Sequence, residues 1–125
     1  MSIQSSTRRR IIVVSGLLWL LAAVPQAHTA LKKSEPAAGK IVTAVPKQIQ
    51  LWFNEKIDVA VSKIELKGPS GKVDLSPAHA MGDNSLMAGV SGKVADGIYT
   101  VAWQAAGDDG HVVKGAFKFT LKLAH

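Results

Sequence analysis

Alternating apolar and polar positions occur in several short runs of the chain and predict β-strands. The clearest runs cover residues 48–53, 63–67, 99–103 and 117–122. In the first of them, Ile49, Leu51 and Phe53 alternate with glutamines and Trp52. Because successive side chains of a strand point to opposite faces, each run is expected to bury one face and expose the other.

Glycine, proline, asparagine and aspartate separate these runs and predict turns between the strands. Such signals occur at residues 68–71 and again at Asp96-Gly97. Shorter strands are expected near residues 30–34, 72–75 and 86–90. Residues 76–85 are rich in turn formers and are expected to form a long loop. The pattern predicts an all-β sandwich without a helix in the mature protein.

The first 27 residues have the features of a secretory signal peptide. Arg8, Arg9 and Arg10 form a basic segment, and the 14 residues 11–24 that follow form an apolar run. A membrane-spanning helix needs roughly 20 apolar residues, so this run is short for an anchor. Cleavage is expected after Ala27, which leaves residues 28–125 as one exported domain of 98 residues. The arginines also resemble a twin-arginine signal, so the export route stays open.

The charge of the chain argues against nucleic acid as a partner. The formal net charge is +6, but removal of the three arginines leaves 12 lysines against nine acidic residues, a net charge of +3. The lysines are scattered, whereas nucleic-acid-binding domains cluster basic residues and use arginine. The chain also lacks cysteine. This excludes copper sites of the blue electron-transfer type, because those sites need a thiolate ligand.

Cleavage after Ala27 would make His28 the first residue of the mature protein. Its free α-amino group and its imidazole could then bind one metal ion as a chelate. Farther along the chain, Asp109-Gly110-His111 supplies a carboxylate and a second imidazole two residues apart. An amine, two imidazoles and a carboxylate form a nitrogen and oxygen donor set that suits tetragonal Cu(II). His28, Asp109 and His111 are therefore the candidate ligands.

Asp109 and His111 are expected to converge, because side chains at positions i and i+2 of an extended chain project to the same side. Gly110 between them has no side chain and permits a bend or a bulge. For the site to close, the strand that begins after His28 must lie beside this segment.

A series of short motifs runs in order along the mature chain. It comprises residues 28–31 (HTAL), 34–39 (SEPAAG), 51–55 (LWFNE), 99–103 (YTVAW), 109–111 (DGH) and 115–119 (GAFKF). In this series the chain resembles the CopC family of periplasmic copper-binding proteins. The resemblance implies a seven-stranded Greek-key β-barrel or sandwich of the immunoglobulin or cupredoxin-like class. It also implies Cu(II) coordination by His28, Asp109 and His111.

The same resemblance implies a function in copper resistance or homeostasis in the periplasm. The protein would sequester or deliver copper rather than act as an enzyme. An inner-membrane copper transporter of the CopD kind is the partner that the resemblance suggests. Glu55 matches a family position near the metal, and two interpretations of it stay open: an outer contributor to the site, or a solvent-facing residue at the end of a strand.

Some members of the family also bind Cu(I) through a methionine-rich loop with a histidine. The corresponding stretch here offers only His79, Met81 and Met87. Thioethers are soft ligands that select Cu(I), and two spaced methionines are few for such a site. We therefore expect His79 to be a surface residue of the loop and Met87 to be a core residue, with the metal site selective for Cu(II).

Two other functions fit parts of the sequence. A terminal histidine at a copper site also resembles the histidine brace of copper oxygenases, but the domain is small and no substrate cleft is evident in its sequence. A metal-free structural domain of the immunoglobulin type is the other alternative. The observation that distinguishes this alternative from the copper hypothesis is whether His28 is the first residue of the mature protein.

Overall fold

The computed structural model describes residues 29–124, so the expected signal peptide (residues 1–27) and His28 lie outside the described part of the chain. Within this range the strands are β1 (Leu31–Glu35), β2 (Ile41–Val42), β3 (Gln48–Phe53), β4 (Lys63–Gly68), β5 (Gly71–Val73), β6 (His79–Ala80), β7 (Ser85–Gly89), β8 (Gly97–Ala106) and β9 (Val112–Leu121). One short 3-10 helix, η1 (Val59–Val61), precedes β4. None of the helical residues described forms a segment long and apolar enough to span a bilayer.

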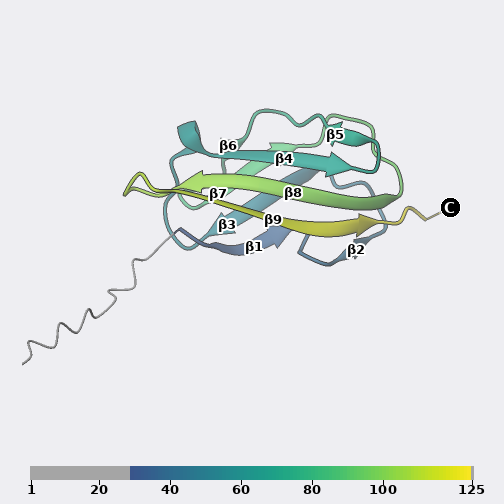
Figure 1. Ribbon diagram of the computed structural model, residues 1–125, viewed down its shortest axis with the longest axis horizontal. Helices are drawn as coiled ribbons and strands as arrows, with labels where there is room; N and C mark the ends of the chain where they lie inside the picture. The colour runs from purple at the N-terminus through teal and green to yellow at the C-terminus, as the bar shows by residue number, and fades with distance from the viewer. Residues whose placement is uncertain (1–28, 125) are drawn as a thin grey trace, which may run out of the picture.

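The strands form two sheets that pack face to face (Figure 1). One sheet has the order β1-β3-β7-β6, and the other has the order β2-β9-β8-β4-β5. Neighbouring strands are antiparallel except β2 and β9, which are parallel. This arrangement confirms the predicted all-β sandwich.

All seven predicted strands are present, and two very short strands were not predicted. β2 and β6 have two residues each, which is too short for a period of two to be recognised. The expected loop at residues 76–85 therefore contains a strand, since His79 and Ala80 of β6 pair with Met87 and Leu86 of β7. Backbone pairing with β7, and not a side-chain pattern, produces β6.

The core lies between the sheets and consists of the apolar side chains that the alternation assigned to one face. Its fully buried large side chains include Ile49, Leu51, Phe53, Leu66, Leu86, Val101 and Leu121. Two aromatic pairs join neighbouring strands or the two sheets: Phe53 with Trp103, edge to face at 5.3 Å, and Tyr99 with Phe119, stacked at 5.5 Å. Such rings supply much of the apolar area in a small β-domain without disulfides.

Tyr99 also fixes the loop before β8. Its hydroxyl donates to the carbonyl oxygen of Ala95 at 2.6 Å and accepts from the amide of the same residue at 2.9 Å. This back-bonding of a buried tyrosine to a residue four positions upstream resembles the tyrosine corner of immunoglobulin-like sandwiches. It satisfies the one polar atom that the ring carries into the core.

One end of the sandwich collects four segments that are far apart in the sequence. The amide of Asn54 donates to the carbonyl of Ala30 at 3.0 Å, and the amide of Ile57 donates to the carbonyl of Asp83 at 3.1 Å. Ile57 also forms a β-bridge with Gly107, just beyond the end of β8. The start of β1, the residues after β3, the β6–β7 turn and the β8–β9 turn therefore meet at this end.

Candidate metal centre

The Asp109-Gly110-His111 motif lies in the turn between β8 and β9, the two longest strands. These strands pair continuously from Gly97 opposite Leu121 to Ala106 opposite Val112, so the turn is carried on a long, regular hairpin. The amide of Gly110 donates to the carbonyl of Gly107 at 3.0 Å. Gly110 has a φ of 75°, a left-handed conformation that glycine adopts without steric cost.

The turn brings Asp109 and His111 together, as expected, but by a different geometry. The amide of His111 donates to Oδ1 of Asp109 at 3.0 Å, and Oδ2 of Asp109 lies 3.8 Å from Nδ1 of His111. The expectation of an extended chain with both side chains on one face was wrong at this point. The left-handed Gly110 reverses the chain, and the Asp109 side chain then bonds to the backbone two residues on, as in an Asx-turn.

The positions of the two side chains suit a shared metal ion. The side chains of Asp109 and His111 are 48% and 63% exposed, so both can be reached from solvent. Nitrogen and oxygen ligands of first-row ions such as zinc lie about 2.0–2.2 Å from the metal, so two donors of one ion are at most about 4.4 Å apart. The separation of 3.8 Å between Oδ2 and Nδ1 falls within this limit.

Two donors do not complete a site. Among residues 29–124, no group of three or more His, Cys, Asp or Glu side chains is arranged to hold a metal ion. A metal ion bound here would need a further donor from outside this range or from a group of another kind. His28 is the candidate that the sequence supplies, and it lies outside the described residues.

Glu55 lies at the same end of the sandwich, shortly after β3. It is half-buried, and Oε1 of its carboxylate accepts a hydrogen bond from the hydroxyl of Thr29. A methyl group added at Gly107 would overlap this oxygen. Glu55 therefore lies between the start of the described chain and the beginning of the β8–β9 turn, and it is not a freely solvated residue.

Thr29 and Gly107 are two residues of this site that the sequence analysis did not single out. Thr29 is only 3% exposed, although it stands at the beginning of the described chain. Gly107 is buried as well and precedes Asp109 by two positions. The hydrogen bond between Thr29 and Glu55 joins residues that are 26 positions apart in the sequence, and no local sequence pattern predicts such a pair.

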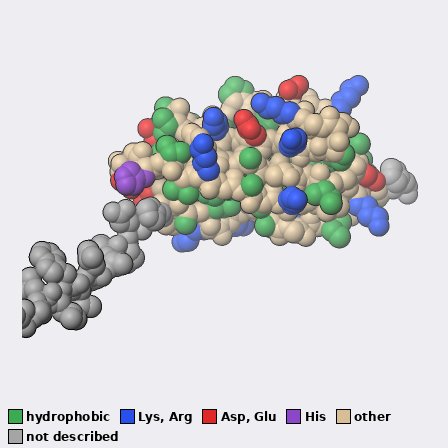
Figure 2. Space-filling model, in the orientation of Figure 1, with side chains coloured by type: hydrophobic (Ala, Val, Ile, Leu, Met, Phe, Trp, Pro, Cys, Tyr) green, Lys and Arg blue, Asp and Glu red, His purple; other side chains and the backbone are tan. Residues whose placement is uncertain are grey.

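The segments at this end of the sandwich, residues 54–58, 81–84 and 107–111, carry more acidic than basic residues. They contain Glu55, Asp58, Asp83, Asp108 and Asp109, and Lys56 is their only lysine or arginine. A local excess of negative charge raises the concentration of cations near a surface. Elsewhere the lysines are spread over the molecule without forming a continuous basic patch on the face in view (Figure 2). The site therefore lies where the charge favours a cation.

His79, Met81 and Met87 lie on the outer side of the four-stranded sheet. His79 is exposed, as expected, and its Nδ1 lies 3.5 Å from the carbonyl oxygen of Pro77. Met81 is 49% exposed. The expectation that Met87 is a core residue was wrong: its neighbours Leu86 and Ala88 point into the core, and Met87 is half-buried opposite His79.

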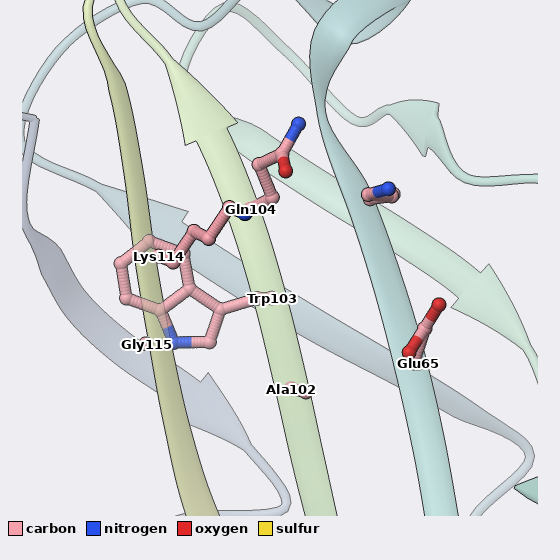
Figure 3. Close-up of a pocket in the computed structure, with 7 residues that line it drawn as sticks. Glu65, Ala102, Trp103, Gln104, Lys114 and Gly115 are labelled. Atoms are coloured by element: carbon pink, nitrogen blue, oxygen red, sulfur yellow. The ribbon is translucent and has the colours of Figure 1, made fainter.

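A shallow depression of about 250 Å³ lies on the outer face of the five-stranded sheet (Figure 3). Its lining residues come from β4, β8 and β9 and are Lys63, Glu65, Ala102, Trp103, Gln104, Lys114 and Gly115. Neither Asp109, His111 nor Glu55 lines it. The depression is therefore separate from the candidate metal centre.

The chain is similar to known proteins in both sequence and fold. A sequence model of the CopC domain matches residues 31–122. Copper resistance protein C of Escherichia coli is 32% identical to this chain over 126 residues, which cover 94% of this chain and 99% of that protein. The similarity therefore extends over nearly the full length of both proteins.

Two crystal structures share the fold. CopC from Methylosinus trichosporium OB3b aligns with a TM-score of 0.72 and 28% identity, covering 78% of this chain and 97% of that one. PcoC, a methionine-rich copper resistance protein from Escherichia coli, aligns with a TM-score of 0.70 and 32% identity, covering 77% of this chain and all of that one. Both alignments include most of the sandwich described above.

Proposed function

The chain belongs to the CopC family, and from this premise we propose that it binds Cu(II) at the end of the sandwich that carries Asp109 and His111. The observation that carries the proposal is the separation of 3.8 Å between Oδ2 of Asp109 and Nδ1 of His111 in an exposed turn. The carboxylate and the imidazole are hard or intermediate ligands, which suit Cu(II) better than Cu(I).

His28 supplies the remaining donors in this proposal. The residue after it, Thr29, donates a hydrogen bond to the carboxylate of Glu55. This carboxylate occupies the space where a side chain at position 107 would lie. The position of Thr29 at this end of the sandwich supports the choice of His28, the residue before it in the sequence, as the further ligand. With the α-amine and imidazole of His28, Asp109 and His111 would complete a set of three nitrogens and one oxygen.

We propose that the protein works outside the cytoplasm, in the periplasm, after removal of residues 1–27. The basic and apolar segments at the beginning of the sequence support this proposal. There the protein would sequester copper or hand it on, as a binding protein and not as an enzyme. A membrane transporter of the CopD kind would be its partner in that transfer. The mass of the exported protein tests the cleavage after Ala27 on which the amine donor depends.

Cu(II) is expected to bind to the processed protein with a stoichiometry of one, and replacement of either ligand in the turn is expected to weaken it. We expect His111→Ala to lower the affinity by more than about tenfold, the equivalent of about 1.4 kcal/mol, and Asp109→Ala to lower it less. The imidazole is the better donor for Cu(II). Competition with a chelator of known affinity gives both values.

His79→Ala is the matched control, because this imidazole is also exposed but lies in β6, which belongs to the other sheet from β8 and β9. It should leave the Cu(II) affinity unchanged. An affinity that is equally strong in wild type, His111→Ala and Asp109→Ala would contradict the proposed site. An equal loss in His79→Ala would show that any exposed histidine contributes and that the turn is not the site.

Reduction of the metal is expected to weaken binding. The described part of the proposed site contains no sulfur ligand, and Cu(I) prefers thiolates and thioethers. A Cu(I) chelator should therefore remove the metal more readily than an equally strong Cu(II) chelator removes Cu(II). A double variant, His79→Ala with Met81→Ala, should behave like wild type in this measurement. Tight Cu(I) binding that this double variant abolishes would instead establish a second, softer site on the outer face of β6 and β7.

A further inference from the structure

The contact between Thr29, Glu55 and Gly107 joins three segments of the chain at the proposed copper site. The Thr29 hydroxyl donates to Oε1 of Glu55, and Thr29 is almost completely buried. A Cβ atom at Gly107 would overlap that same oxygen, and it would lie 2.9 Å from Cδ of Glu55 and 2.6 Å from Oγ1 of Thr29. The carboxylate and the hydroxyl therefore occupy the space that any side chain at position 107 would need.

The requirement for glycine at position 107 is one of size. Gly107 is not among the glycines with a positive φ, so its backbone conformation is open to any residue. Gly110, three residues later, differs in this respect: it has a φ of 75° and nothing within 4 Å of its Cβ position. The two glycines of the turn are thus required for different reasons, a steric one at Gly107 and a conformational one at Gly110.

The backbone on both sides of the contact is held by other bonds. The amide of Ala30 donates to Oδ1 of Asn54 at 2.8 Å, and the amide of Asp58 donates to the carbonyl of Ala106 at 2.8 Å. Gly107 is itself bridged to Ile57. A side chain at position 107 would therefore displace the Glu55 carboxylate before it displaced the strands, because the end of a glutamate side chain moves more easily than a paired backbone.

We propose that Gly107 is a positioning residue for the copper site. By leaving room for the Glu55 carboxylate it lets Glu55 hold Thr29, and this contact fixes the start of the mature chain against the turn that carries Asp109 and His111. The inference rests on the proposed function. In this proposal Glu55 is also a positioning residue, and it acts through its hydrogen bond with Thr29. Thr29 then connects this contact to His28, the residue before it in the sequence.

The contact itself is tested in the metal-free processed protein with a double-mutant cycle. Gly107→Ala, Glu55→Ala and the double variant are unfolded with urea. In the presence of Glu55, the alanine at position 107 should raise the unfolding equilibrium constant. In the Glu55→Ala background, the factor by which Gly107→Ala raises this constant should be at least about fivefold smaller, because the overlap with the carboxylate is relieved. An effect of equal size in both backgrounds would overturn the inference, because Gly107 would then act independently of Glu55.

The positioning role is tested by Cu(II) affinity at a temperature where every variant is folded. Gly107→Ala and Thr29→Val should each lower the Cu(II) affinity by at least about tenfold. Thr29→Ser keeps the hydroxyl, and its affinity should stay within a few-fold of wild type. A merely structural contact would lower stability and leave the affinity of the folded protein unchanged, and that result would refute the role. If wild type itself bound no Cu(II), the proposed function would fail, and the urea cycle would still decide whether the contact exists.

Discussion

One alanine added before His28 in the processed protein is expected to lower the Cu(II) affinity by about a hundredfold or more, the equivalent of about 2.7 kcal/mol. The extension leaves the imidazole of His28 unchanged but converts its α-amine into an amide. An amide nitrogen is a much poorer donor at neutral pH, so the chelate formed by the amine and imidazole of one residue is lost. The effect should exceed that of His111→Ala, because the extension breaks a ring and not only one bond.

The measurement is competition of each protein with a Cu(II) chelator at fixed pH. An alanine added after His125, at the other terminus, is the matched control and should leave the affinity unchanged. The unfolding temperature of the metal-free extended protein should equal that of the unextended one, which separates loss of a donor from loss of the fold. Equal affinity in the extended and unextended proteins would exclude the terminal amine as a ligand.

The strands could be predicted because burial on one face imposes a period of two. In β3, Ile49, Leu51 and Phe53 are fully buried, and Gln50 and Trp52 between them are half-buried. The same alternation explains why Trp52, despite its size, is only half-buried. It lies on the outer side of β3, where the ammonium of Lys33 lies 4.7 Å from its ring centroid.

The candidate metal centre could be predicted only as a set of ligand types. The sequence indicates that Asp109 and His111 act together, but the geometry that joins them depends on the left-handed Gly110 and on a hydrogen bond from the His111 amide. Period-two reasoning does not apply inside a turn of this kind. The pairing of Asp109 with His111 was thus accessible from residue types and spacing, and the turn geometry that joins them was not.

Thr29 and Gly107 could not be predicted, because their importance depends on contacts between distant segments. Glu55 follows Thr29 by 26 positions, and Gly107 follows β8, which belongs to the other sheet from β1 and β3. A glycine in a turn close to a second glycine indicates conformational freedom before it indicates close packing. Only the position of the Glu55 carboxylate reveals that the two glycines of this turn differ.

Gly115→Val is expected to destabilise the metal-free protein by about 3 kcal/mol, although valine is a far better strand former than glycine. Gly115 lies in β9 directly opposite Trp103 of β8. A Cβ at Gly115 would lie 2.5 Å from Cζ2 and 2.6 Å from Cε2 of the indole. The ring cannot move away freely, since Phe53 contacts it from the other sheet with centroids 5.3 Å apart. Because β-propensity spans only about 1 kcal/mol, the steric cost decides the sign.

Thermal unfolding measures this effect, and the midpoint should fall by about 12 °C or more for a domain of this size. Ala116→Val is the matched control: Ala116 is the next residue of β9, but it is exposed on the outer face of the sheet and should tolerate the larger side chain. A smaller side chain at position 103 should relieve the overlap, so Gly115→Val should cost less in a Trp103→Leu background than in wild type. A midpoint that rises in Gly115→Val would mean that strand propensity outweighs packing here, and that the indole of Trp103 does not require the space above Gly115.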